Sequence, residues 1–262
     1  MNGQADVKEA YANFVVATDG SDLCGIALTG ALQLASRTGA GLHVIHVAGD
    51  MAGHAAATRQ VEDLLAGHPH TFEVRNLIAG TPMTPSKLID EFADEVGDAV
   101  VIVGTHGRSG LGAALLGSTT AELVSRPGRT TVVYGPKAGQ PQNISGPQNI
   151  SRVVACVDGT AFSELSMQEG ARWASALQVS LLVTQVVPPG ETTDASVFGG
   201  AEVLHSPSPA DAISSAFGSD PTALLVLATH GRVGFKRVTM GSVASEVVRK
   251  ARGPVALVHP RV

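Results

Sequence analysis

Two glycine-rich segments hold the residue types best suited to binding chemistry. The first reads GTHG at residues 104–107 and is followed, after nine residues, by Gly117 and Ser118. Glycines let a backbone turn sharply and approach a phosphate group closely. A helix that begins at Gly117 would add unpaired N–H groups and the positive end of the helix dipole. Ser118, or Thr119 and Glu122 at the spacing of a capping box, signals such a start, so the pattern predicts a phosphate-binding loop.

The same segment occurs a second time, 124 residues later. The run LVLATHGRVGFKRVTMGSVASEVV repeats VIVGTHGRSGLGAALLGSTTAELV, with Gly241 in the place of Gly117. Two copies of the whole arrangement argue against a chance match. In the second copy Ala228 replaces the first glycine, and its methyl group is expected to crowd a ligand or to demand a disfavoured backbone angle.

The two copies also differ in charge. The loop of the second copy contains Arg232, Lys236 and Arg237, whereas that of the first contains Arg108 alone. Charge therefore favours the second copy for a polyphosphate, and the complete set of glycines favours the first. Because exposed charges add only about 1 kcal/mol each and a steric clash is not screened by solvent, we expect the first copy to bind more tightly.

A carboxylate ends the first expected strand of each copy. Asp19 closes FVVATD and Asp158 closes VVACVD, 139 residues later. In open parallel sheets, ligands bind beyond the carboxyl ends of the strands. Each aspartate is therefore either a ligand contact or a capping residue of the helix that follows.

The second copy is shorter than the first between its second and fourth strands. The strands that end at Val47 and Val186 match at the offset of 139, whereas the glycine segments match at 124. The missing 15 residues correspond to about one helix with its turn. The segment PPGETTDASVFGG is expected to form a loop where the first copy has its second helix.

Apolar runs alternate with helical patterns through the first copy. Strands are expected at 14–18, 42–47, 71–78, 99–104 and 130–134, and helices at 22–37, 55–66, 84–95 and 119–124. Strands such as AVVIVG are apolar throughout, which is typical of parallel strands covered on both faces. The expected fold class is α/β, with two tandem doubly wound five-stranded parallel-sheet domains at residues 1–136 and 152–262. Residues 137–151, in which PQNIS occurs twice, have no apolar period and are expected to form a linker.

Composition excludes several classes of partner. The net charge is −5 and the arginines are spread along the chain, so no nucleic-acid partner is expected. No run approaches the roughly 18 to 20 apolar residues of a membrane span, and Met1–Tyr11 does not resemble a signal peptide, so no membrane partner is expected. Cys24 and Cys156 occupy unmatched places, which predicts no disulfide and no metal site and favours a cytoplasmic location.

The glycine segments also carry a resemblance to a known family. Gly104, Gly107, Gly117 and Ser118 reproduce the pattern Gly-x-x-Gly, nine residues, Gly-Ser or Gly-Thr. The chain in this respect resembles the ATP-binding universal stress proteins, over both copies and nearly the whole length outside the linker and the N-terminal tail. The resemblance implies tandem domains of the adenine-nucleotide α-hydrolase-like fold, with ATP, with or without Mg²⁺, as the ligand. It also implies that the fifth strands, at 130–134 and 254–258, pair antiparallel within one chain.

The same likeness implies which residues contact the nucleotide. Strand ends at Asp19 and Val47 would hold adenine and ribose, and the glycine segment would hold ribose and phosphates. The implied contacts in the first copy are Ala17, Thr18, Asp19, Val47, Val103, Gly104, Gly107, Arg108, Gly117, Ser118, Thr119 and Thr120. Those in the second copy are Asp158, Val186, Ala228, Gly231, Gly241, Ser242 and Val243. The implied partners are the other copy in a pseudo-dimer, a second chain in a homodimer, and an unidentified regulatory protein.

The residues do not predict an enzyme. The chain has no GxxxxGK[S/T] loop, no kinase signature and no GxGxxG after its first strand. His106 and His230 recur inside the glycine segments, but a histidine in a tight turn is more often a structural hydrogen-bonding group. No catalytic residue is therefore assigned, and the expected function is nucleotide-dependent regulation in stress response or growth control. A scaffold that binds partners without nucleotide, and a slow ATPase, are the alternatives.

Overall fold

The computed structural model describes residues 11–48, 51–77, 82–105, 117–139, 149–160, 162–229 and 240–261. Strands and helices alternate in each half of the chain. The elements of the first half are β1 (Asn13–Thr18), α1 (Asp22–Thr38), β2 (Gly41–Ala48), α2 (Met51–Leu65), β3 (Thr71–Asn76), α3 (Pro85–Val96), β4 (Ala99–Gly104), α4 (Ser118–Val124) and β5 (Thr130–Tyr134). Those of the second half are β6 (Arg152–Val157), α5 (Ser163–Leu177), β7 (Ser180–Val187), the 3₁₀ helix η1 (Ala195–Phe198), β8 (Glu202–His205), α6 (Pro209–Ala216), β9 (Ala223–Ala228), α7 (Ser242–Lys250) and β10 (Val255–Val258).

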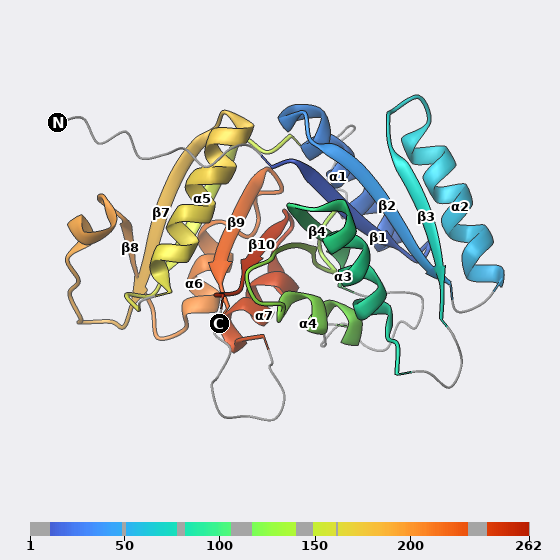
Figure 1. The fold of residues 1–262 in the computed structure, drawn as a ribbon. Coiled ribbons are helices and arrows are strands. Elements are labelled where there is room, and N and C mark those ends of the chain that lie inside the picture. The colour runs from blue at the N-terminus through green and yellow to red at the C-terminus, as the bar shows by residue number, and fades with distance from the viewer. Residues whose placement is uncertain are drawn as a thin grey trace.

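The ten strands of the described chain form one continuous sheet (Figure 1). Their order is β3-β2-β1-β4-β5-β10-β9-β6-β7-β8, so each half contributes five neighbouring strands. The strands are parallel within each half, and β5 and β10 pair antiparallel, with Val133 opposite Val255 and Thr130 opposite Val258. The α/β prediction and the antiparallel pairing of the fifth strands within one chain are both confirmed. This pairing covers two strand edges that would otherwise be open to other chains.

The sequence accounts for these elements locally. The central strands β4 and β9 read AVVIVG and ALLVLA and are buried along most of their length, because helices cover both faces of the sheet. Helix α1 begins where the Ser21 side chain accepts a hydrogen bond from the Cys24 amide, and α3 begins with Thr84 as its cap and Pro85 in its first turn. The largest departure from the expected boundaries is α2, which begins at Met51.

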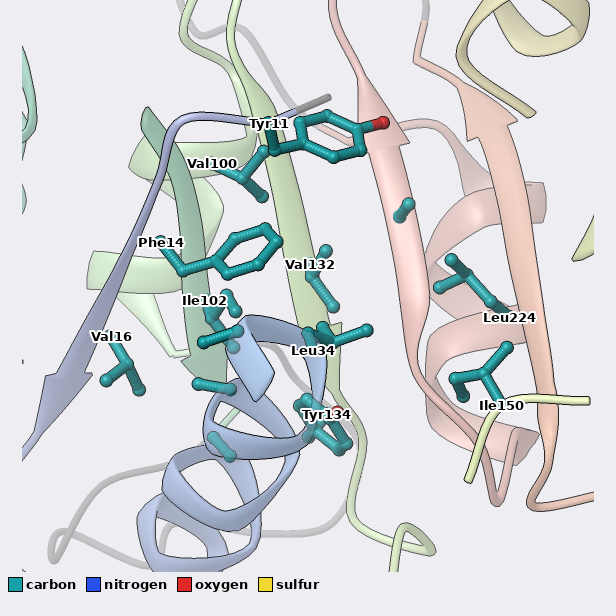
Figure 2. Close-up of a cluster of buried hydrophobic side chains, with 14 of the residues drawn as sticks. Tyr11, Phe14, Val16, Leu34, Val100, Ile102, Val132, Tyr134, Ile150 and Leu224 are labelled. Atoms are coloured by element: carbon teal, nitrogen blue, oxygen red, sulfur yellow. The ribbon is translucent and has the colours of Figure 1, made fainter. Parts of the chain in front are cut away.

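The helices divide between the two faces, and each face has a core that continues through both halves. Helices α1, α2 and α5 cover one face, and α3, α4, α6 and α7 cover the other. Figure 2 shows the first core, with Phe14, Ile102 and Val132 of the first half on one side and Leu224 of the second half on the other. Within the described ranges, no helix is long and apolar enough to cross a membrane.

Side chains from both halves interlock at the junction. The ring of Trp173, which is fully buried, has its centroid 4.2 Å from that of Tyr11 and 5.8 Å from that of Phe14. The Arg172 guanidinium carbon lies 3.9 Å from the Tyr11 ring centroid, and Glu169 accepts a hydrogen bond of 2.9 Å from the Tyr11 hydroxyl. The tandem domains therefore form an intramolecular pseudo-dimer.

The ends of the expected linker are packed against the domains. Ala138 and Ile150 are both buried, and the Arg37 guanidinium donates hydrogen bonds to the carbonyl groups of Ile150 and Leu177. The expected linker thus enters the core at its two ends although it has no apolar period, because single apolar residues need no periodic pattern to enter an existing core. Residues 140–148 lie outside the described part of the chain.

The connection between β7 and β8 is the main difference between the halves. Residues 188–201 are all described, and they contain the 3₁₀ helix Ala195–Phe198 and no α-helix. The first half has α2 at the corresponding place. The expected loop is therefore confirmed, and the second half lacks the helix that packs beside α1 in the first half.

Candidate functional site

A cavity of about 790 Å³ opens at the carboxyl ends of the second-half strands. It lies between the ends of β6, β7 and β9 and the first turns of α5, α6 and α7. Six of the seven implied second-copy contacts line this cavity, namely Asp158, Val186, Ala228, Gly241, Ser242 and Val243. The seventh, Gly231, lies outside the described residues, as do the loop residues His230, Arg232, Lys236 and Arg237. The structure therefore brings together the described residues that the sequence grouped into one site.

The N-terminus of α7 borders the cavity without a side-chain cap. Gly241 is the N-cap residue, with φ −57° and ψ 151°, and no side chain accepts a hydrogen bond from the first turn within the described residues. A Cβ atom added to Gly241 would meet no described atom within 4 Å. Unpaired N–H groups and the positive end of a helix dipole make such a terminus suitable for a phosphate group.

The loop after β6 is held by its own side chains. Asp158 Oδ1 accepts hydrogen bonds from the Thr160 amide at 3.0 Å, the Thr160 hydroxyl at 2.6 Å and the Ser163 hydroxyl at 3.1 Å. The Ser163 hydroxyl oxygen in turn accepts from the amides of Asp158 and Gly159, each at 3.0 Å. Asp158 thus shapes the loop that forms one wall of the cavity, in addition to any contact it makes with a ligand.

The alanine in the second glycine segment causes no backbone strain. Neither Gly104 nor Ala228 has a positive φ, so the expectation of a disfavoured backbone angle at residue 228 is wrong. A Cβ atom added to Gly104 would lie 3.0 Å from Leu23 Cγ, and this close contact with α1 accounts for the glycine. In the second half, Ala228 lines the cavity and its amide donates a 2.7 Å hydrogen bond to the Ser166 hydroxyl.

The corresponding helix terminus in the first half is more confined. The Gly117 amide donates a 2.8 Å hydrogen bond to the Thr105 carbonyl oxygen, and a Cβ atom on Gly117 would lie 2.9 Å from that oxygen. Helix α4 has Gly117 as its N-cap, and no side chain of the described residues caps it, so the expected capping role of Ser118 or Thr119 is wrong. Glu122 does not close a capping box, because its carboxylate accepts hydrogen bonds from Ser86 and Thr84 of the neighbouring helix α3.

Helix α2 fixes the loop after β1 in the first half. Gly20 has φ 79°, and a Cβ atom there would lie 2.8 Å from Ala56 and Ala57 of α2. The Gln60 side chain donates to the Ser21 carbonyl at 2.8 Å and accepts from the Thr18 hydroxyl at 2.6 Å. The second half has no such helix, and a Cβ atom on Gly159 would meet one described atom within 4 Å, the Gln185 side-chain nitrogen at 3.4 Å.

The remaining implied contacts of the first copy differ in how exposed they are, and some lie outside the described residues. Thr18 and Val103 are buried, with 5% and 4% of their surface exposed, and Val47 packs against the core on the α3 face. The Thr120 hydroxyl donates to the Gly104 carbonyl at 3.0 Å. Ala17 and Asp19 are partly exposed, whereas Gly107, Arg108 and His106 lie outside the described residues. These contacts favour an open site in the second half, opposite to the preference that the glycines alone predict.

Sequence reasoning missed part of the cavity wall. Eleven further residues line it, namely Cys156, Val157, Phe162, Ser163, Ser166, Pro209, Ile213, Leu227, Thr229, Met240 and Ala244. Pro209 and Ile213 belong to α6, whose start was signalled by Ser208 as N-cap and the proline that follows it. Because α6 begins at the same edge of the sheet as α5 and α7, its first turn completes the cavity.

The wall is mainly apolar, with hydroxyl groups at intervals. Asp158 is the one charged residue among the described residues that line the cavity. No cluster of three potential metal ligands occurs within the described residues. A magnesium ion that arrives with a nucleotide would therefore be held chiefly by the phosphates and water.

Cys156 provides a chemical probe of this cavity, because it lines the wall and is buried. Burial raises the pKa of its thiol to about 12, and burial together with the charge of Asp19 raises that of Cys24 to about 12. At pH 8 about one thiol in ten thousand is then ionised, against roughly a quarter at an ordinary pKa. We expect iodoacetamide to label both cysteines at least a hundredfold more slowly in the folded protein than in urea. Rapid labelling of Cys156 in the folded protein would contradict this placement.

Comparison with known proteins agrees with this architecture. Residues 10–133 and 200–259, together more than half of the chain, match the model of the universal stress protein family. A universal stress protein from Mycolicibacterium smegmatis is 28% identical over 190 residues, which cover 62% of this chain and 62% of that protein. The alignment thus spans less than two thirds of that relative's length.

Solved structures show the same tandem fold. A protein of unknown function from Pseudomonas aeruginosa PAO1 has a TM-score of 0.68 over 96% of this chain and 93% of its own, at 16% identity. A universal stress protein from Archaeoglobus fulgidus DSM 4304 has a TM-score of 0.67 over 97% of this chain and 98% of its own, also at 16% identity. A universal stress protein in complex with cAMP covers 48% of this chain and 98% of its own, at 28% identity and a TM-score of 0.39. The family match in both halves and the shared tandem fold establish that this chain belongs to the universal stress protein family, as a two-domain member.

Proposed function

We propose that the chain is a regulatory protein that binds ATP in the cavity of its second half and does not turn it over at an appreciable rate. The observation that carries this proposal is the 790 Å³ cavity with apolar walls and the uncapped N-terminus of α7 at its edge. The volume is in the usual range for small-molecule sites. Apolar walls suit a nucleotide base, and the helix terminus suits its phosphates.

We favour regulation over catalysis because the described part of the cavity wall has few groups that could assist phosphoryl transfer. That reaction needs groups that neutralise developing charge and orient a nucleophile. Asp158 is the one charged residue among the described lining residues, and its Oδ1 atom already accepts hydrogen bonds from Thr160 and Ser163. The remaining lining side chains are apolar or carry a hydroxyl or thiol group.

Helix α5 offers a route from the cavity to the junction of the halves. Phe162, immediately before α5, and Ser166 in its first turn line the cavity. Glu169, the next turn along, accepts hydrogen bonds from Tyr11 and Thr130 of the first half. A nucleotide that shifts the start of α5 would therefore change contacts between the halves, where a partner protein in the cytoplasm could detect it.

The test is to identify and titrate the ligand. We expect mass spectrometry of the small molecules released from the denatured purified protein to detect an adenine nucleotide, and titration calorimetry to detect ATP binding. We expect ATP turnover below about one per minute, far under the usual enzyme range. Steady turnover above that rate and abolished by His230→Ala, or by His106→Ala at the matched position of the first half, would favour an ATPase. Absence of any bound or binding nucleotide would favour the scaffold.

A further inference from the structure

We propose that Phe162 stacks on the nucleotide base and makes the second-half site selective for ligands that carry a planar aromatic ring. This inference rests on the proposed function, because it assigns a base contact within the same cavity. Phe162 is the aromatic residue among the described residues that line the cavity. Aromatic residues make up only 4% of the chain, so an aromatic ring in this wall is a specific feature of the site.

The backbone that carries Phe162 is fixed on both sides. Phe162 is the N-cap residue of α5, with φ −82° and ψ −13°. Its carbonyl oxygen accepts hydrogen bonds from the amides of Leu165 at 3.1 Å and Ser166 at 3.4 Å, and the Ser163 amide donates to the Thr160 carbonyl at 3.0 Å. A backbone that is already ordered loses less conformational entropy when a ligand packs against the side chain it carries.

The matched position of the first half carries a different kind of side chain. At the matched position of the first half, 139 residues earlier, stands Leu23. Leu23 packs so closely on the end of β4 that a Cβ atom on Gly104 would lie 3.0 Å from its Cγ atom. In the second half, Ala228 replaces the glycine and Phe162 replaces the leucine, and both residues line the cavity. The second half therefore presents an aromatic ring to the cavity at the position where the first half has an aliphatic side chain close to the end of β4.

The other walls fit the same kind of ligand. Pro209, Ile213 and Met240 supply apolar surface, whereas Gly241 and Ser242 mark the start of α7. A base between Phe162 and this apolar surface leaves the helix terminus to the phosphates. Stacking of a base on an aromatic side chain corresponds to roughly a 5- to 150-fold change in affinity when the ring is removed.

The experiment compares Phe162→Leu, which copies the first half, with Phe162→Tyr, which keeps a ring. We expect Phe162→Leu to weaken ATP binding about 10- to 100-fold at an unchanged unfolding midpoint, and Phe162→Tyr to bind within about threefold of the wild type. Leu23→Ala, at the matched position of the first half, is the control and is expected to leave ATP affinity unchanged. Equal ATP affinity of Phe162→Leu and the wild type would overturn the inference.

Saturation-transfer NMR supplies a readout that a purely structural role would not move. We expect irradiation of protein aromatic protons to transfer saturation to the adenine protons of ATP in the wild type, and this transfer to be lost in Phe162→Leu. Wild-type protein that binds ATP without such transfer would overturn the stacking role alone. If the wild-type protein binds no nucleotide, that result would contradict both the proposed function and the stacking role.

Discussion

Replacing Gly241 with valine is expected to abolish ATP binding while the protein stays folded. Gly241 has φ −57° and ψ 151°, a conformation that any residue adopts, and no described atom lies within 4 Å of an added Cβ. The side chain would instead occupy space beside the N-terminus of α7, where we place the phosphates. Loss of one or two charge-assisted hydrogen bonds there costs about 2–5 kcal/mol of binding free energy. Calorimetry measures the binding, and the free energy of unfolding in urea is expected to fall by about 1 kcal/mol or less, because valine is a poorer N-cap residue than glycine.

The matched variant Gly117→Ala is expected to show the opposite behaviour. Its new Cβ atom would lie 2.9 Å from the Thr105 carbonyl oxygen, a backbone atom that cannot move aside easily. We expect a loss of about 1–3 kcal/mol in the free energy of unfolding, and ATP affinity close to that of the wild type. The glycine pattern alone predicts the reverse for binding. Retained tight binding in Gly241→Val together with its loss in Gly117→Ala would place the site in the first half.

Replacing Trp173 with alanine at the junction of the halves is expected to lower the free energy of unfolding strongly. Trp173 is fully buried, and its ring lies against Tyr11 and Phe14 of the first half. Truncation of a buried tryptophan costs about 3–5 kcal/mol through lost contacts and the cavity that remains. Because the two halves share both cores and one sheet, we expect them to unfold in a single transition at a lower urea concentration.

Circular dichroism measures the unfolding transition of Trp173→Ala. Limited proteolysis with fragment analysis shows which half unfolds. Trp173→Phe keeps an aromatic ring in the shared core and is expected to be less destabilising. Two separate unfolding transitions, with only the second half destabilised by Trp173→Ala, would show that the halves fold independently. That outcome would contradict a pseudo-dimer built on a common core.

The fold could be predicted because its signals are local and repeated. Strands such as those at 99–104 and 223–228 are apolar throughout, and this is what burial on both faces of a parallel sheet requires. The two offsets between the copies revealed the helix that the second half lacks. The antiparallel pairing of β5 with β10 was implied by family resemblance and was not evident from the strand residues themselves.

The site could be predicted only in outline, because its details depend on contacts between distant segments. Glu122 has capping-box spacing, yet its carboxylate bonds to Ser86 and Thr84 across the helix pair. Gly104 resembles a ligand contact, whereas its close neighbour is Leu23. The confinement of Gly117 by the Thr105 carbonyl cannot be read from a motif that both halves share. Phe162 belongs to no motif in the sequence, and only its position in the cavity wall indicates a role in binding.

A crystal structure of the chain with a non-hydrolysable ATP analogue would show directly whether the second-half cavity binds the nucleotide. We expect density for one nucleotide in the second-half cavity, with its base against Phe162 and its phosphates at the start of α7, beside Gly241. Density only in the first half, between Asp19 and Gly117, would contradict the proposed site.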